Sequence, residues 1–347
     1  MSSKKKKITT DATRLKIVIV TSGLSPIVRP LLASRHSVAG IIDFASGNGA
    51  SAPESTLPRL MRRAYHTLKQ PAPTLESVAR KHRVPYYHAQ SVRDPQLEQR
   101  IRRWRPDLMV VYYAPLLRKN IFSLPLRGTI NLQPSTLPKY RGGHPLFWTA
   151  YHLETHAGVT VHYIDAGMDT GDILYQKTVP IRPGLREAAL EELMIQRHGV
   201  DLTLKAVDAV ATGRPPRTPQ PAACPTGLAP RVTAAKLATL IDWQNWPITR
   251  LWSVLRFAEA WQQVTPPPPH GWQGGCHWTI GPYTREPVRG EPGSLAQDEK
   301  GYYLVHPEGK IRLVVRYDVK RVVKRLLSKL SSASAMGMIV LAQSLGV

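Results

Sequence analysis

Two polar segments carry the side chains best suited to chemistry. The first is the string Asn131-Leu-Gln-Pro-Ser-Thr-Leu-Pro-Lys-Tyr-Arg-Gly142, and the second is Asp165-Ala-Gly-Met-Asp-Thr-Gly-Asp172. The Asn131 amide can donate a hydrogen bond to a developing oxyanion, and the Asp169 carboxylate can accept a proton from an amine. Taken singly, each residue is also an ordinary turn former. Taken together, the two segments are much more specific, and they offer an oxyanion donor and a proton acceptor, two groups that acyl transfer to an amine needs.

The position of these segments in the chain also favours a site. Asn131 ends a short apolar run, and a polar residue at the carboxyl end of a buried parallel strand faces the crevice where open α/β sheets bind ligands. Residues 135–142 form a loop punctuated by proline, and the glycines of residues 165–172 let the backbone approach a ligand closely. We therefore expect both loops to border one crevice.

The elements that would position these loops alternate between strands and helices. Apolar runs and helical periodicity predict strand 15–21, a helix containing Leu31 and Leu32, strand 38–44, helix 74–82, strand 85–87, helix 94–104 and strand 108–112. Three more strands, 128–131, 159–164 and 173–179, precede a long helix over 185–211. Such alternation predicts an α/β fold with a mostly parallel sheet covered on both faces.

Shifts in composition divide the chain into five parts. We expect a disordered basic tail over 1–14, a first domain over 15–212, a Pro-rich linker over 213–235, a small barrel-like domain over 236–315, and a basic amphipathic helix and tail over 316–347. The 347 residues suffice for two such domains.

Composition excludes several classes of protein. The chain is 42% hydrophobic and 20% charged, and its apolar runs are strand-sized, so we expect no transmembrane segment. Cys224 and Cys276 have no CxxC partner, which predicts neither a disulfide framework nor a zinc site, and we expect no metal site. A cytoplasmic location fits this cysteine usage.

The net charge of +23 points to anionic partners without naming one. Nucleic acid, anionic lipid and phosphorylated small molecules would all be attracted, and a generally basic surface is the alternative. Residues 319–330 place valines and leucines on one helix face and lysines and arginines on the other. That helix could contact an anionic membrane or RNA peripherally, or dock onto its own barrel.

The stretch from Gly128 to Ile181 resembles the signature region of the 10-formyltetrahydrofolate-dependent formyltransferases, especially the methionyl-tRNA and amino-sugar branches. The family pattern Ser-Leu-Leu-Pro-x-x-Arg-Gly is matched by Ser135-Thr-Leu-Pro138 with Arg141 and Gly142, and Asp-x-Gly-x-Asp-x-Gly-Asp is matched by residues 165–172. The family's Gly-Val-Thr is present at residues 158–160. The resemblance implies a Rossmann-like domain, a small β-barrel (OB-like) C-terminal domain, and 10-formyltetrahydrofolate as formyl donor.

By that resemblance, Asn131 and Asp169 would be two of three catalytic residues. The family pattern Asn-x-His is broken at its third position, where this chain has Gln133. A glutamine amide can donate a hydrogen bond to an oxyanion, but it cannot carry a proton near neutral pH. We include Gln133 as the third candidate catalytic residue on this basis.

Binding of folate and acceptor is expected at the same two loops. The resemblance places folate against residues 111–117 and residues 165–172. His144 is either a substitute proton carrier or an ordinary packed residue. The candidate binding residues are Ser135, Leu137, Pro138, Tyr140, Arg141, Gly142, His144, Asp165, Gly167 and Asp172.

Three functions remain open at this point. The first is an N-formyltransferase acting on a small amine such as an amino-sugar nucleotide, since Gly142-Gly-His-Pro-Leu-Phe-Trp148 is similar to the amino-sugar enzymes. The second is methionyl-tRNA formyltransferase, favoured by the charge and by an inserted basic segment at Ser55 to Lys69 that would contact tRNA phosphates. The third is a non-catalytic relative that binds folate or acceptor, suggested by Gln133.

Overall fold

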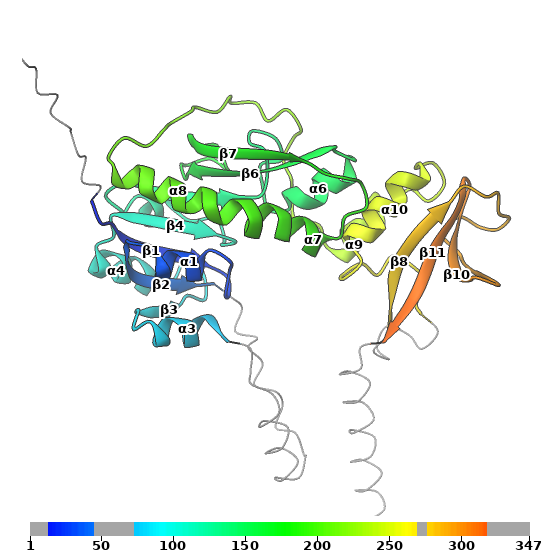
Figure 1. Ribbon diagram of the computed structural model, residues 1–347, viewed down its shortest axis with the longest axis horizontal. Coiled ribbons are helices and arrows are strands. Elements are labelled where there is room, and N and C mark those ends of the chain that lie inside the picture. The colour runs from blue at the N-terminus through cyan, green and yellow to red at the C-terminus, as the bar shows by residue number, and fades with distance from the viewer. Residues whose placement is uncertain (1–12, 45–72, 269–275, 318–347) are drawn as a thin grey trace, which may run out of the picture.

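The computed structural model describes residues 13–44, 73–268 and 276–317, which form two units (Figure 1). The larger is built on a seven-stranded sheet of order β3-β2-β1-β4-β5-β6-β7, and the smaller on a four-stranded sheet of order β8-β11-β10-β9. This architecture confirms the predicted α/β class, with a Rossmann-like sheet followed by a small β unit.

The first five strands of the large sheet are parallel. They are β1 (Lys16–Thr21), β2 (Ser37–Asp43), β3 (Tyr86–His88), β4 (Leu108–Tyr112) and β5 (Thr129–Gln133). Then β6 (His156–Tyr163) pairs antiparallel with β5, and β7 (Ile173–Pro180) pairs antiparallel with β6. The predicted site residues therefore lie where the parallel part of the sheet meets its antiparallel extension.

Helices cover both faces of this sheet because its central strands are apolar on both sides. On one face, Ile19 and Val110 belong to the core that contains α1 (Val28–Ala33), α3 (Leu75–Lys81) and α8 (Val200–Ala211). On the other, Val20 and Val111 belong to the core that contains α4 (Pro95–Trp104) and α5 (Lys119–Phe122). Adjacent strand residues thus alternate between two cores.

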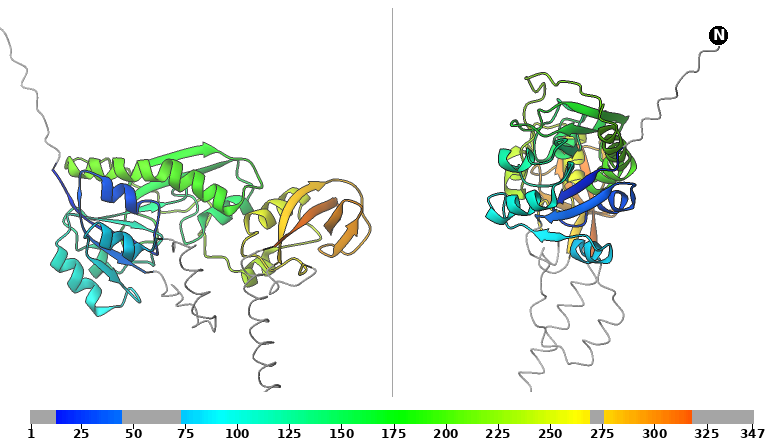
Figure 2. Two further views of the ribbon diagram at one scale, coloured as in Figure 1. Left: turned by 60° about the horizontal axis from the view of Figure 1, so that its bottom comes forward. Right: turned by 90° about the vertical axis from the view of Figure 1, so that its left-hand side faces the viewer.

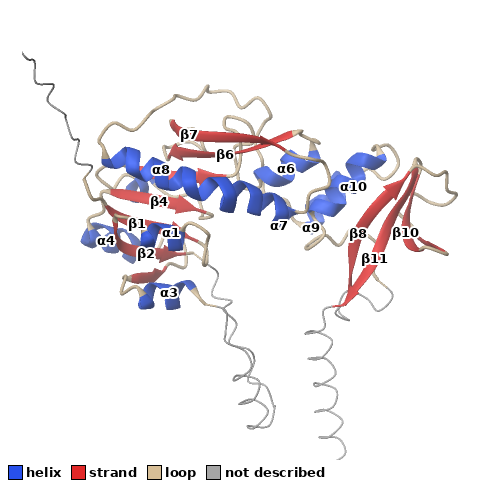
Figure 3. Cartoon of the chain, viewed as in Figure 1, coloured by secondary structure: helices blue, strands red, loops and turns tan. Residues whose placement is uncertain are grey.

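The helical ends follow the sequence signals closely. The Thr74 side chain accepts a hydrogen bond from the Ser77 backbone N–H at the start of α3, and Asp94 caps α4 through the Gln96 N–H. The long helix expected over 185–211 consists of three consecutive segments with no break between them. They are α7 (Glu187–Glu191), a π-helical stretch (Glu192–Gly199) and α8. This long helix runs along the large sheet (Figure 3).

The second unit is a four-stranded antiparallel sheet in the place expected for the barrel. Its strands are β8 (Cys276–Thr284), β9 (Leu295–Asp298), β10 (Gly301–His306) and β11 (Gly309–Tyr317), and β8 and β9 are the edges of the described sheet. Helices α9 (Ala234–Leu240) and α10 (Ile248–Phe257) lie between the two sheets (Figures 1 and 2).

Helix α10 belongs to the hydrophobic cores of both units. Val254 and Phe257 pack in the core of the large unit, where the Phe257 ring centroid is 6.0 Å from that of Phe147 on α6 (Pro145–Tyr151). Ile248 and Leu251 pack in the core of the four-stranded sheet. The two units are therefore joined by shared apolar burial as well as by the chain.

Part of the predicted linker packs against the large unit. Thr218 forms a β-bridge with Ile173, and Ala229 is fully buried. We call residues 218–229 the strap. Composition could not predict this packing, because it reports proline content but not the partners available to the backbone. The Pro-rich linker over 213–235 and the other domain limits proposed from composition stay predictions.

Several expectations fall on residues that the structure does not describe. They concern most of the basic tail, the inserted segment from Ser55 to Lys69 and the amphipathic stretch 319–330. In the described ranges, no helix combines the length and apolar character needed to cross a bilayer.

Substitution of Gly40 on β2 will test the packing of α4 against the sheet. A Cβ at this position would lie 2.5 Å from an atom of the Trp104 ring, so we expect Gly40→Ala to lower the free energy of unfolding by about 1–3 kcal/mol. Denaturant unfolding followed by tryptophan fluorescence measures the change. Gly143→Ala is the control, since its Cβ would meet nothing closer than 4.0 Å. Equal midpoints for both variants would contradict the packing described.

Candidate active site

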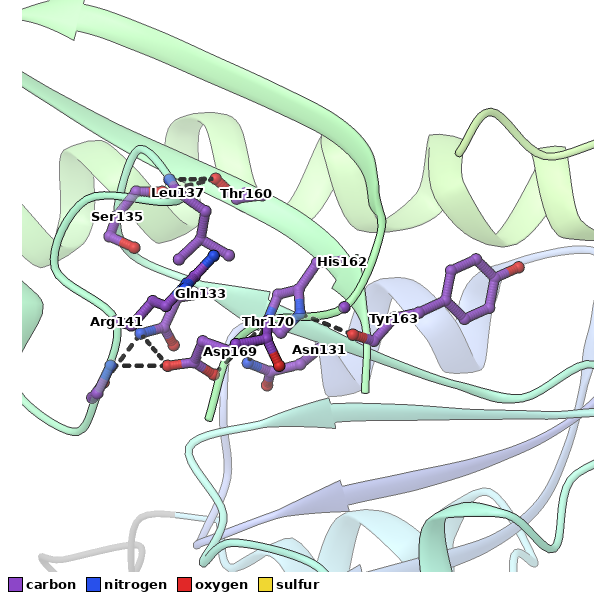
Figure 4. A network of polar contacts seen from close by, with 12 residues as sticks. Asn131, Gln133, Ser135, Leu137, Arg141, Thr160, His162, Tyr163, Asp169 and Thr170 are labelled. Carbon is purple, nitrogen blue, oxygen red and sulfur yellow. Dashed lines mark hydrogen bonds and ion pairs between the residues drawn. The ribbon is translucent and has the colours of Figure 1, made fainter. Parts of the chain in front are cut away.

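Four polar side chains from three segments meet at the carboxyl end of β5 (Figure 4). Asn131 and Gln133 lie on β5, His162 lies opposite Asn131 on β6, and Asp169 lies in the loop between β6 and β7. The structure thus brings together the three candidate catalytic residues and adds a histidine.

Asp169 is the centre of this group. Its Oδ2 accepts hydrogen bonds from the Gly142 backbone N–H at 2.8 Å and from Gln133 Nε2 at 3.1 Å. Its backbone has a φ of +55°, an uncommon value for a residue other than glycine. Burial raises the pKa of Asp169 above its ordinary value, although the nearby His162 and the Gly142 N–H act in the opposite direction. A carboxylate with a raised pKa is a stronger base.

Gln133 is placed to orient Asp169. Its Nε2 donates to the Gly142 carbonyl oxygen at 2.9 Å and to Asp169 Oδ2 at 3.1 Å, which uses both hydrogens of the amide. No N–H of Gln133 then remains for an oxyanion. In this arrangement, Gln133 fixes the carboxylate and leaves oxyanion donation to Asn131.

His162 is almost fully buried, with 1% of its surface exposed. Its Nδ1 is 2.8 Å from the Tyr163 carbonyl oxygen, and its Nε2 is 3.2 Å from Asn131 Nδ2 and 3.6 Å from Asp169 Oδ1. Burial lowers the pKa of His162, which favours the neutral imidazole. An imidazole therefore does occur in this site, on a different strand from the one that the family pattern indicates.

A small cavity opens beside these groups. Its polar lining consists of Asn131, His162, Asp165 and Asp169, and its apolar lining includes Val111 and residues 114–117, on the loop after β4. Tyr113, Leu116 and Met168 are 62%, 63% and 42% exposed near this lining. The two regions expected to receive folate thus border one cavity with an apolar rim.

The proline-punctuated loop 135–142 packs against β6, and two of its backbone groups form hydrogen bonds to a side chain of that strand. Thr160 Oγ1 donates to the Ser135 carbonyl oxygen at 2.6 Å and accepts from the Leu137 N–H at 3.3 Å. Ser135 and Leu137 are buried, and the Leu137–Pro138 peptide bond is cis. The hydroxyl of Ser135 is buried without a hydrogen-bond partner in the described structure. These contacts fix the course of the loop toward Gly142.

Tyr140 and His144 have their polar atoms engaged outside the Asp169 group. The Tyr140 hydroxyl donates to Glu154 at 2.7 Å. His144 Nδ1 accepts from the Val232 N–H at 3.2 Å, so Nε2 carries the hydrogen that faces Glu187 Oε1, also at 3.2 Å. The His144 ring stacks with Phe147, as expected for a packed residue rather than a proton carrier of this site.

The strap is hydrogen-bonded to both site loops, residues 135–142 and residues 165–172. Arg141 is only 3% exposed, and its guanidinium donates to Gln220 Oε1 at 3.0 Å and to the Pro221 carbonyl oxygen at 2.7 Å. Gln220 Nε2 in turn donates to the carbonyl oxygens of Asp169 at 3.0 Å and Gly171 at 2.7 Å. Arg141 and Gln220 therefore connect the loop 135–142 to the loop 165–172.

Gly142 meets a steric constraint from the strap. Its φ is +131°, and a Cβ would lie 2.7 Å from the Ala229 carbonyl oxygen. Any other residue would displace the N–H that binds Asp169.

The remaining candidates shape the second loop. Asp165 Oδ1 accepts from the Gly167 N–H at 3.1 Å and from Thr170 Oγ1 at 2.6 Å, which closes a turn around Gly167. Asp172 Oδ2 pairs with Arg217 at 3.2 Å. Asp165 and Gly167 line the cavity, whereas Asp172 is not among its lining residues.

Sequence reasoning missed His162 and Gln220. His162 interrupts the apolar strand Val159 to Ile164, and a polar residue inside a buried strand was the available signal. Gln220 lies in a Pro-rich segment and gives no comparable signal, because its role depends on the folded path of the strap.

Comparison with known proteins identifies the family. The family model described as formyl transferase matches residues 59–202. The methionyl-tRNA formyltransferase of Roseiflexus sp. (strain RS-1) is 30% identical over 262 residues, covering 72% of this chain and 72% of that protein. This chain belongs to the formyltransferase family. The resemblance seen in the motif strings is confirmed at this level.

Other formyltransferases match over shorter regions. The methionyl-tRNA formyltransferase of Syntrophus aciditrophicus is 38% identical over 43% of this chain and 48% of that protein. The one from Trichlorobacter lovleyi is 35% identical over 55% of this chain and 59% of that protein. The matched regions thus span about half the length of these two relatives.

Two solved structures share the fold. HypX from Aquifex aeolicus, in complex with tetrahydrofolic acid, aligns with a TM-score of 0.54 and 16% identity over 88% of this chain and 45% of that chain. WlaRD, a sugar 3N-formyl transferase, aligns with a TM-score of 0.53 and 13% identity over 88% of this chain and 98% of that chain. At these low sequence identities, the two alignments indicate a shared architecture alone.

Removal of the Arg141 guanidinium will test the attachment of the strap. Arg141→Ala leaves the oxygens of Gln220, Pro221 and Ala222 without this donor, so we expect a loss of about 2–4 kcal/mol in unfolding free energy. Limited proteolysis within the strap will also become faster. Arg80→Ala, at a 77% exposed arginine of α3, is the control and will change neither measurement appreciably. Unaltered proteolysis of Arg141→Ala would show that the strap is held by other contacts.

Proposed function

We propose that this formyltransferase moves a formyl group from 10-formyltetrahydrofolate to a primary amine. The observation that carries the proposal is the convergence of Asn131 and Asp169 at the cavity where the parallel sheet ends, with Gln133 hydrogen-bonded to Asp169. An amide donor and a buried carboxylate base are the groups that formyl transfer to an amine requires.

The chemistry of the cavity lining is compatible with a folate donor. 10-Formyltetrahydrofolate would supply the activated formyl group. Leu116 and Leu117 of the lining offer apolar contact to a flat ring system, and Asn131, His162, Asp165 and Asp169 supply its polar groups. Support also comes from HypX, solved with tetrahydrofolic acid, and WlaRD, solved with 5-N-formyl-THF.

The roles of the residues follow from their hydrogen bonds. Asn131 donates from Nδ2 to the formyl oxygen as negative charge develops there. Asp169 accepts the proton that the attacking amine loses and returns it to the folate nitrogen that leaves. Gln133 and the Gly142 N–H hold the Asp169 carboxylate in place during both transfers.

We propose the methionyl group of an aminoacylated tRNA as the acceptor. Three relatives at 30–38% identity are methionyl-tRNA formyltransferases. The net charge of +23 suits a polyanionic partner. An amino-sugar nucleotide is the second candidate, favoured by the similarity of residues 142–148 to the amino-sugar enzymes. The two free cysteines, Cys224 and Cys276, suit the cytoplasmic setting that both acceptors share.

A non-catalytic relative was the third function left open by the sequence. The loss of the histidine at position 133 was its main support. Catalysis is supported instead by the imidazole of His162 in the site and by the Asp169 carboxylate, whose Oδ2 accepts two hydrogen bonds. Catalysis is therefore part of our proposal.

Substitution of Asp169 will test the proposed base. Asp169→Asn keeps the shape of the side chain but cannot take the amine proton, so we expect single-turnover formyl transfer to slow by about 10²–10⁴-fold. In the native protein, the rate will fall as the pH drops through the raised pKa of Asp169, that is, above the range of an ordinary aspartate. Rapid-quench measurement of formylated product over pH checks both expectations.

The matched control is Asp201→Asn, at an exposed aspartate of α8. Its transfer rate will equal that of the native protein. Full activity of Asp169→Asn would remove Asp169 from the mechanism, and absence of transfer by the native protein to every amine supplied would reject the proposed function.

Salt dependence will discriminate between the two acceptors. For tRNA, the logarithm of the binding constant will fall steeply with the logarithm of salt concentration, since each neutralised phosphate releases counterions. Binding is measured by fluorescence anisotropy with initiator tRNA, and transfer is measured in parallel with charged initiator tRNA and with pooled amino-sugar nucleotides. Transfer to the nucleotides alone would replace the tRNA proposal by the second candidate.

A further inference from the structure

The family pattern places an imidazole at position 133, and this chain supplies an amide there instead. A second imidazole reaches the same group of side chains from the neighbouring strand. We propose that His162 is a positioning residue that orients the Asn131 amide and shares with Asp169 the proton taken from the acceptor amine. This inference rests on the proposed function and names how its site works without a histidine at position 133.

The hydrogen bonds of His162 determine which of its nitrogens carries the proton. Nδ1 lies 2.8 Å from the Tyr163 carbonyl oxygen, which can only accept, so Nδ1 carries the hydrogen. In the neutral ring, Nε2 therefore presents a lone pair. The atom that meets it at 3.2 Å is Asn131 Nδ2, a donor.

This bond selects the orientation of the Asn131 amide. A flipped amide would bring its oxygen against the Nε2 lone pair, which is repulsive. In the selected orientation, one Nδ2 hydrogen binds His162 and the other is left for the cavity that Asn131 lines. His162 thereby directs a donor toward the place where the formyl oxygen becomes negative.

The contact between His162 and Asp169 is poised to accept one proton. Nε2 and Oδ1 lie 3.6 Å apart, and with both groups deprotonated a lone pair faces a carboxylate oxygen. A proton on Asp169 Oδ1 turns this contact from repulsive to attractive, because the Nε2 lone pair can accept from it while still facing the Asn131 Nδ2 donor. The other charged groups that act on His162 are Asp165 and Arg141, with opposite effects on the imidazolium.

Burial lowers the pKa of His162 and raises the pKa of Asp169. In water the imidazole is the stronger base of the two, and both shifts favour a proton on the Asp169 carboxylate more than water does.

The proton balance of the reaction is closed by these residues. As the bond between the amine nitrogen and the formyl carbon forms, Asp169 accepts the amine proton and His162 stabilises it through Nε2. As the bond between the formyl carbon and the folate nitrogen breaks, Asp169 delivers that proton to the departing nitrogen. No other reactant is consumed.

The test compares His162→Gln with the double variant Gln133→His/His162→Gln. Glutamine at position 162 cannot titrate, so we expect kcat to fall by about 10²-fold, with KM for the folate donor within about threefold of the native value. The double variant restores an imidazole on β5, and we expect it to regain about tenfold or more of the lost kcat. The acid limb of the pH profile of kcat will also differ between His162→Gln and the native protein.

A matched control separates this role from the loss of a buried ring. His306 on β10 is also 1% exposed and has both ring nitrogens hydrogen-bonded to backbone, so His306→Gln removes a comparable imidazole from the other unit. Circular dichroism and thermal unfolding will show that each variant is folded. His306→Gln will keep the native kcat and pH profile.

A spectroscopic measurement tests the pair directly. In protein labelled with 15N-histidine, the His162 signals will show the tautomer with hydrogen on Nδ1, and Asp169→Asn will shift the titration of His162. An unshifted titration, or a native kcat and pH profile in His162→Gln, would overturn this inference while formyl transfer by the native protein upheld the proposed function. Absence of native transfer would overturn both.

Discussion

A buried carboxylate must be surrounded by donors, and this requirement at Asp169 organises the site. The carboxylate is removed from water by the two loops that meet over β5, and its desolvation would be costly without hydrogen bonds. The Gly142 N–H and the Gln133 amide supply them from the opposite loop and from the strand. Both donors reach one oxygen atom, Asp169 Oδ2. Three features bring them there: the path of residues 135–142, the glycine at position 142 and the register of β5 against β6.

The same requirement explains why the strap is not a loose connection. The Asp169 backbone has a left-handed conformation, and the carbonyl oxygens of Asp169 and Gly171 need donors of their own. Gln220 provides both, and Arg141 fixes Gln220. Polar groups of the strap therefore complete hydrogen bonding that neither site loop could complete alone.

The sequence predicts the parallel strands and the main helices because their signals are local. The apolar run of β4 and the caps Thr74 and Asp94 are visible in any short window of residues. Asn131 and Asp169 were found because they stand at strand and loop positions with a recognisable motif.

His162 and Gln220 could not be assigned in this way, since their functions depend on the antiparallel pairing of β5 with β6 and on the packing of the strap. Local periodicity carries no information about such long-range contacts. The role of Gln133 likewise became clear only when both of its N–H groups could be assigned to partners.

Helix α10 limits where the two units of this chain can be separated. Phe257 packs in the core around Phe147. Leu251, fewer than two helical turns before it, packs in the core of the C-terminal sheet. A cut placed at the end of the strap would strip apolar cover from the unit that holds the site. A cut placed after α10 would instead remove Ile248 and Leu251 from the core of the C-terminal sheet, so exchange of that sheet between relatives costs apolar contacts on either side of the helix.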